Sequence, residues 1–213
     1  MMKLIGMLDS PFVRRVAISM QLLDIEFDHQ ALSVFRDFDR FQAINPAVKA
    51  PTLICDEGQA LMDSTLILSY LDTVSTNNRS LMPHSMSEYQ LALRIVGLAL
   101  TACEKSVQLV YEQMLRPEEK RHQPWIDRVR SQLTDCYRLL EQEASRNTLA
   151  GRSDNIRQTG ITTACAWYFT QQMNPGVIDP NQYPTLAKYS EQVEQLTEFK
   201  AASFHADQFN GDK

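Results

Sequence analysis

Along residues 1–74, short apolar stretches alternate with stretches whose apolar positions recur at helical spacing. Such alternation predicts strands and helices in the order βαβαββα. The expected strands are residues 3–7, 27–32, 51–55 and 60–62, and the expected helices are residues 11–23, 37–44 and 65–74. The last two strands are separated by Asp56-Glu57-Gly58, a turn signal typical of a β-hairpin.

From residue 87 onward, apolar residues recur with helical spacing only. The expected helices are residues 87–115, 125–144, 161–173, 184–196 and 199–204. The third of these is the most apolar, so we expect it at the centre of a helical bundle. A polar stretch at 75–80 and Pro83 separate the two patterns. The sequence therefore predicts a first domain at 1–76, a linker at 77–86 and an all-helical domain at 87–213.

Composition and charge exclude several classes of function. The formal net charge is -5 and no Lys/Arg-rich run is present, so nucleic-acid binding is not expected. No stretch has the length of a membrane span, and the first residues do not resemble a secretion signal. The four Cys and four His are scattered without metal-ligand spacing, so no metal site is expected. These features favour a cytoplasmic protein.

Ser10 and Pro11 give the clearest local signal for chemistry. Ser followed by Pro is a strong helix start, with Ser at the N-cap. In a thioredoxin-like βαβαββα fold, the start of the first helix carries the reactive group. A disulfide reductase needs a thiolate there, and this chain has Ser. The Ser10 hydroxyl could instead donate a hydrogen bond to a substrate thiolate beside the positive end of the helix, or it could simply cap the helix.

Three further segments occur with Ser10-Pro11-Phe12 in a family-specific order. The segment from Asn45 to Leu53 reads NPAVKAPTL, Asp63-Ser64 follows, and the segment from Tyr183 to Tyr189 reads YPTLAKY. Together they resemble the glutathione transferase family over nearly the whole chain, and the serine is similar to that of its bacterial, Ser-type, theta-like members. The resemblance implies an α/β thioredoxin-like N-terminal domain followed by an all-α C-terminal helical bundle.

The resemblance also implies a role for individual residues. The implied catalytic group is Ser10, the implied glutathione-binding residues are Ala50, Asp63, Ser64, Lys49 and Arg36, and the implied structural cis-proline is Pro51. The backbone of Ala50 would pair with the cysteinyl backbone of glutathione. Asp63 and Ser64 would hold the ammonium and carboxylate of the γ-glutamyl end, and the two basic residues would meet the glycyl carboxylate. The alternative is that Asp63-Ser64 only caps a helix and that the two basic residues are ordinary solvated charges.

Two positions depart from the family pattern. Gly160 stands where many members have the Asp of a capping box at the start of the central helix. Either Thr159 caps that helix instead, or the alignment with the family pattern shifts by a residue or two. Tyr189 stands in place of a Trp. The departure at Gly160 concerns the stability of that helix more than the glutathione site.

The function implied by the resemblance is conjugation of glutathione to a small hydrophobic electrophile, as in detoxification. Glutathione would be a co-substrate, no tightly bound cofactor is expected, and the protein would be a homodimer. One alternative is an isomerase, dehalogenase or peroxidase that uses the same thiolate. Another is a non-enzymatic binding or regulatory protein on the same scaffold.

Overall fold

The computed structural model describes residues 1–76 and 79–207. The elements in this part of the chain are β1 (Met2–Ile5), α1 (Pro11–Leu22), β2 (Phe27–Gln30), α2 (Phe38–Ile44), β3 (Thr52–Ile54), β4 (Ala60–Met62), α3 (Ser64–Val74), α4 (Met86–Met114), η1 (Glu118–Lys120), α5 (Gln123–Ser145), α6 (Gln158–Met173), η2 (Pro180–Gln182), α7 (Pro184–Val193) and α8 (Thr197–Ala201). They form two compact units: Met1–Leu81 together with the segment from Leu196, and Met82–Gln195.

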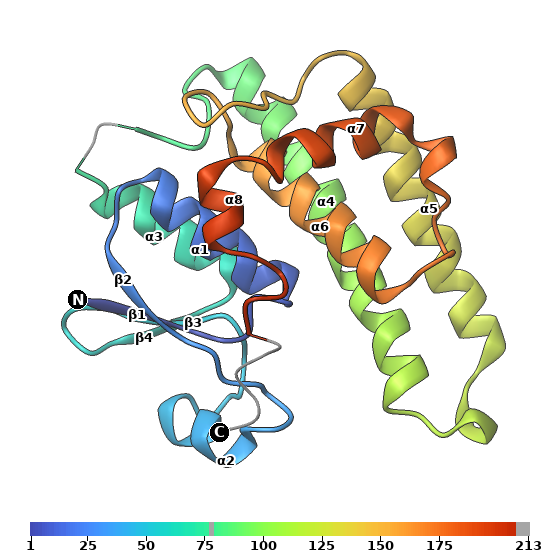
Figure 1. Ribbon diagram of the computed structural model, residues 1–213, viewed down its shortest axis with the longest axis horizontal. Coiled ribbons are helices and arrows are strands. Elements are labelled where there is room, and N and C mark those ends of the chain that lie inside the picture. Colours follow the sequence, from blue (N-terminus) through green and yellow to red (C-terminus); the bar gives the residue numbers. More distant parts are fainter. Residues whose placement is uncertain (77–78, 208–213) are drawn as a thin grey trace. The chain divides into compact units, whose positions relative to one another are not determined.

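The first unit is built on a four-stranded sheet with strand order β2-β1-β3-β4 (Figure 1). Strand β1 is parallel to β2 and antiparallel to β3, and β4 is antiparallel to β3. A parallel pair needs a crossover connection, which α1 provides, whereas β3 and β4 are joined by a short hairpin. The predicted order βαβαββα and the thioredoxin-like α/β architecture are confirmed.

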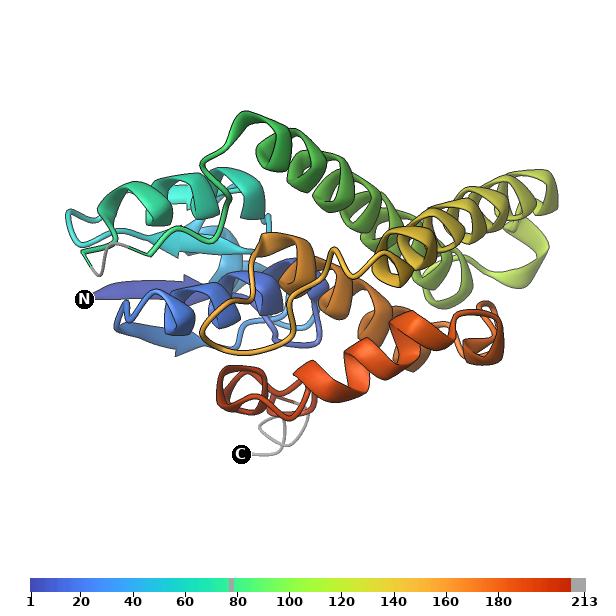
Figure 2. The ribbon, with the colours of Figure 1, turned by 90° about the horizontal axis from the view of Figure 1, so that it is seen from above.

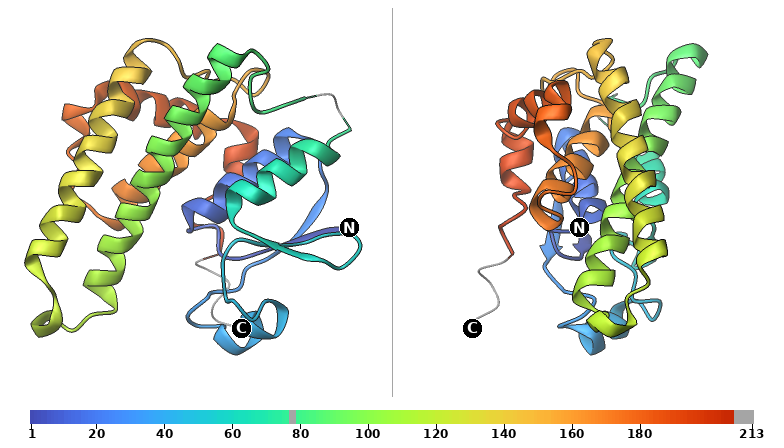
Figure 3. Two further views of the ribbon diagram at one scale, coloured as in Figure 1. Left: turned by 180° about the vertical axis from the view of Figure 1, so that it is seen from behind. Right: turned by 90° about the vertical axis from the view of Figure 1, so that its right-hand side faces the viewer.

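Helices cover both faces of this sheet. Helices α1 and α3 pack side by side on one face, as the views in Figures 1 and 3 agree. On the other face, Ile5, Leu32 and Phe41 form a buried cluster, to which α2 contributes Phe41. The sheet therefore has an apolar layer on each side, and its loops are held from both faces.

The second unit is all-helical. Helices α4 and α5 run side by side and are joined at one end by the turn that contains η1 (Figure 3), while α6 packs against α4 and α7 (Figure 2). Twelve of the sixteen residues of α6 are buried, in agreement with its expected central position. The Thr170 hydroxyl of α6 lies 2.5 Å from the Ser106 hydroxyl and 2.6 Å from that of Tyr137. These three buried hydroxyl groups are thus paired within the bundle.

The start of α6 differs from the sequence expectation. The helix begins at Gln158, so Thr159 lies inside it, and the alternative in which Thr159 caps the helix is wrong. The N-cap residue is Arg157, whose side chain makes no capping hydrogen bond. The Tyr189 hydroxyl donates to the Ala150 carbonyl over 2.7 Å, and a Cβ on Gly160 would overlap its oxygen. The two departures from the family pattern are therefore spatially coupled, because Tyr189 occupies the space that an Asp in place of Gly160 would need.

The end of the chain packs differently from the expected division into 1–76 and 87–213. The boundary between Leu81 and Met82 lies inside the expected linker 77–86, but the segment from Leu196 belongs to the first unit. Helix α8 packs on α1, where Arg14 donates to the carbonyl of Ala202 over 2.8 Å. No helix in the described ranges is both long and apolar enough to cross a membrane.

Candidate functional site

Ser10 occupies the N-cap position of α1. Its N–H donates to the Met7 carbonyl over 3.1 Å, which closes a turn, and its own carbonyl accepts the Arg14 N–H over 2.9 Å. Pro11, at the first helical position, has no N–H to be capped. The Ser10 side chain makes no capping hydrogen bond. The backbone of Ser10 therefore begins the helix, while its hydroxyl is not used as a cap.

The environment of this hydroxyl is favourable for a negative charge. The first N–H groups of an α-helix lack partners within the helix, and the helix dipole places partial positive charge there. No acidic residue lies in the first turn of α1. Asp9 directly precedes Ser10, and burial, followed by the charge of Asp207, raises the pKa of its carboxyl, against the opposing effects of Arg36 and a hydrogen bond from the Ser10 backbone. The start of α1 itself is therefore the feature that favours an anion beside Ser10.

Gly6 brings the loop between β1 and α1 against Ala50. Its φ is +135°, and an added Cβ would lie 2.7 Å from Val13 Cγ2 and 3.2 Å from Ala50 Cβ. Only glycine combines this backbone conformation with so close an approach. The expected residues Ser10 and Ala50 therefore belong to neighbouring loops.

The segment that contains Ala50 is held by buried and half-buried hydrogen bonds. The Ala50–Pro51 peptide bond is cis. The Asn45 side chain donates to Thr52 Oγ1 over 2.8 Å and accepts the Ala47 N–H over 3.0 Å, and Thr52 donates to the Lys49 carbonyl over 2.7 Å. These bonds tie both ends of the loop together, so the backbone of Ala50 is presented in one conformation.

Replacing Asn45 with alanine is expected to destabilise the protein by about 1–3 kcal/mol, because buried polar groups of the loop lose their partner. Urea unfolding measures this change. The matched control is Asn181→Ala, which alters an exposed side chain bonded to Asp179 and should change the stability by no more than about 0.5 kcal/mol. Equal effects of the two substitutions would contradict this account of the loop.

The start of α3 carries the acidic and hydroxyl pair. Asp63 is exposed, and its carboxylate caps α3 by accepting the Thr65 N–H over 2.9 Å. Ser64 is buried, and its hydroxyl accepts from Arg15 Nη1 over 3.2 Å. A hydroxyl that accepts from a guanidinium keeps its own proton for donation to an anion. Arg15 is also buried and connects α1 to the start of α3.

The two basic residues expected at the site are both exposed. Arg36 Nη2 lies 3.8 Å from Met7 Sδ, which places it beside the turn that ends at Ser10. Lys49 contributes its backbone carbonyl to Thr52. Arg36 and Ala50 thus lie beside the loop that ends at Ser10. Arg15 connects Ser64 with α1, the helix that begins after Ser10.

The sequence reasoning did not identify Arg15, His29 or Asp207. Two adjacent arginines in an otherwise apolar helix were a usable signal for Arg15, because a buried guanidinium needs polar partners. No local pattern in the sequence indicated His29 or Asp207. The described ranges contain no group of three His, Cys, Asp or Glu that could hold a metal ion.

Comparisons with known proteins show similarity to glutathione transferases in both sequence and fold. Residues 4–78 match the family of glutathione S-transferase N-terminal domains. A GST-like protein of Escherichia coli (strain K12), YibF, is 27% identical over 165 residues, which cover 78% of this chain and 80% of the relative. Glutathione S-transferase U4 of Arabidopsis thaliana is 30% identical over 91 residues, 43% of this chain and 40% of that protein.

Solved structures extend the similarity to both units. A glutathione transferase family member from Pseudomonas fluorescens Pf-5, solved with bound glutathione, is 28% identical and superposes with a TM-score of 0.81 over 95% of this chain and 98% of that chain. Its complex with S-(propanoic acid)-glutathione gives the same TM-score. Residues 4–78 thus match a glutathione S-transferase N-terminal domain, and the chain has the glutathione transferase fold.

Proposed function

We propose that this protein is a glutathione transferase in which the Ser10 hydroxyl donates a hydrogen bond to the thiolate of bound glutathione. The observation that carries the proposal is the placement of Ser10 at the N-terminus of α1 with no capping hydrogen bond from its side chain. A hydroxyl in that position adds to the stabilisation that the helix start itself gives to an anion. The match of residues 4–78 and the glutathione-bound structural relatives support the same ligand.

The remaining site residues have complementary roles in this proposal. The backbone of Ala50 pairs with the cysteinyl backbone of glutathione, next to the cis peptide bond to Pro51. Asp63 binds the γ-glutamyl ammonium, and the Ser64 hydroxyl, held by Arg15, donates to the γ-glutamyl carboxylate. Lys49 and Arg36 are the cations for the glycyl carboxylate.

The reaction that we propose is attack of the thiolate on a small hydrophobic electrophile. A free thiol with a pKa near about 8.5 is only a few per cent ionised at neutral pH, and each unit of depression corresponds to about 1.4 kcal/mol. Glutathione brings the reactive sulfur, so no tightly bound cofactor enters the proposal. A Ser-type, theta-like class, a homodimer, a cytoplasmic location and a role in detoxification belong to the same proposal.

Replacing Ser10 with alanine is expected to raise the thiol pKa of bound glutathione by about one unit, because one charge-assisted hydrogen bond to the thiolate is lost. The ultraviolet absorbance of the thiolate, followed against pH, measures this change. Calorimetry of glutathione binding should show a much smaller effect, since the backbone and Asp63-Ser64 contacts remain.

The matched control is Ser131→Ala, which removes an exposed hydroxyl from α5 in the other unit. This variant should retain the thiol pKa and the glutathione affinity of the wild-type protein. If glutathione does not bind at millimolar concentration, the site is wrong and a regulatory role on this scaffold becomes the better explanation. If glutathione binds but its thiol pKa is the same in wild type and Ser10→Ala, the catalytic role of Ser10 is wrong.

A further inference from the structure

The turn that ends at Ser10 is anchored at almost every residue. The Gly6 N–H donates to the Gln30 carbonyl over 3.1 Å, and the Gly6 carbonyl lies 2.8 Å from His29 Nε2. The Met7 carbonyl accepts the Ser10 N–H. The hydrogen-bond acceptor for the Leu8 N–H comes from a residue 199 positions later in the sequence. The Leu8 N–H donates to Asp207 Oδ2 over 2.6 Å, a short hydrogen bond of the charge-assisted kind.

Asp207 is itself held in place. It is 5% exposed, and its Oδ2 lies 4.0 Å from His29 Nε2, the same nitrogen that lies beside the Gly6 carbonyl. A buried carboxylate requires such partners, because desolvation penalises its charge. The carboxylate, the imidazole and the loop backbone therefore form one connected polar cluster next to Ser10.

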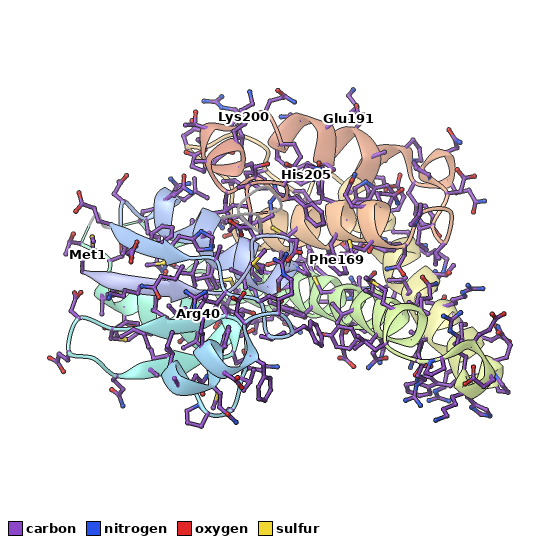
Figure 4. The ribbon with its side chains drawn as sticks, turned by 60° about the horizontal axis from the view of Figure 1, so that its bottom comes forward. Met1, Arg40, Phe169, Glu191, Lys200 and His205 are labelled. Carbon is purple, nitrogen blue, oxygen red and sulfur yellow. The ribbon has the colours of Figure 1, made fainter. Side chains whose placement is uncertain are left out.

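The segment that carries Asp207 is fixed on α1. The guanidinium of Arg14, only 2% exposed, donates to the carbonyls of Ala202 and Phe199 at the end of α8 and lies 5.7 Å from the centre of the Phe199 ring. A cation at the C-terminus of a helix is favourable for its dipole. Figure 4 labels Lys200 on α8 and His205 in the turn that leads to Asp207. Helix α1 and its preceding turn are thus bonded to the same C-terminal segment.

We propose that Asp207 is a positioning residue for Ser10: by accepting the Leu8 N–H, its carboxylate holds the Met7–Ser10 turn in the conformation that presents the Ser10 hydroxyl. This inference rests on the proposed function. The other charged or titratable groups described around the turn are Asp9, His29 and Arg36. The raised pKa of Asp9, caused first by burial and then by Asp207, agrees with two carboxyl groups facing this turn.

Two substitutions separate the hydrogen bond from the charge. Asp207→Asn retains an oxygen that accepts the Leu8 N–H, whereas Asp207→Ala removes it. In Asp207→Ala we expect the thiol pKa of bound glutathione to rise by about half a unit or more, and in Asp207→Asn to stay within about 0.2 units of wild type. We also expect the Leu8 amide to exchange with solvent about tenfold faster in the alanine variant only, measured by NMR.

Asp72→Asn, an exposed charge change at the far end of α3, is the matched control and should leave both readouts unchanged. The inference is overturned if the asparagine variant behaves like the alanine variant, because the charge and not the acceptor would then act. It is also overturned if Asp207→Ala frees the Leu8 amide without moving the thiol pKa. The wild-type measurement tests the proposed function separately. If the wild-type protein leaves the thiol pKa of glutathione unshifted, the proposed function itself is overturned, whatever the Asp207 variants show.

Discussion

Replacing Gly160 with alanine is expected to destabilise the second unit by about 2–4 kcal/mol, because the new methyl group overlaps a buried, hydrogen-bonded oxygen. The Tyr189 hydroxyl is held by the Ala150 carbonyl, which would itself lie 3.1 Å from the added Cβ. The ring therefore cannot move away without losing its hydrogen bond and its packing. Urea unfolding of the purified protein measures the change.

Gly97 provides a control within the same unit. It lies inside α4, and an added Cβ would find no atom within 4 Å. Gly97→Ala should therefore stabilise the protein by about 0.5–1 kcal/mol, as expected for alanine in a helix interior. The double variant Gly160→Ala/Tyr189→Phe removes the overlapping oxygen, so it should be more stable than the sum of the two single changes predicts. Additive effects would show that the two residues are not coupled.

Replacing Gly6 with alanine is expected to cost about 3 kcal/mol or more and to weaken glutathione binding at least tenfold. The backbone at φ +135° disfavours any side chain, and the new methyl group would press on Val13 and Ala50. Either the first turn of α1 or the loop before Pro51 must then shift, and both belong to the proposed site. Unfolding in urea and calorimetry with glutathione measure the two effects.

Gly58 separates the backbone effect from the steric one. It also has a positive φ, +86°, but an added Cβ there would meet nothing within 4 Å. Gly58→Ala should therefore cost only about 1 kcal/mol and leave the glutathione affinity unchanged. If the two alanine variants lost the same stability and kept the same affinity, the close approach of Gly6 to Ala50 would have no functional importance.

Local signals explain why much of the first unit could be predicted from the sequence. Ser10 and Pro11 mark the start of α1, and Asn45 and Pro46 mark the end of α2, because a proline restricts its own backbone and that of the residue before it. The place of Ser10 at a helix start suggested it as a site residue, whereas Ala50, Asp63 and Ser64 were implied by the resemblance of their segments to the glutathione transferase family. Whether these residues bind glutathione stays a prediction.

The residues that could not be predicted depend on contacts between distant parts of the chain. Arg15 and Ser64 are 49 residues apart, and Leu8 and Asp207 are 199 apart. No periodicity or spacing indicates which buried arginine meets which hydroxyl. The start of α6 was misjudged for a similar reason, since the space around Gly160 is determined by Tyr189 of another helix. In each case tertiary packing, and not local propensity, decides the outcome.

The discontinuous first unit has a consequence for biosynthesis. A ribosome makes the sheet, α1 and the Ser10 turn first, then the helices of the second unit, and after them the segment that contains α8 and Asp207. A nascent chain can thus complete its helical bundle while the earlier-made unit still lacks Phe199 and the acceptor for Leu8. Chains released before Leu196 would carry every residue of the proposed glutathione site. Helix α1 would nevertheless lack α8, which packs on it in the complete first unit.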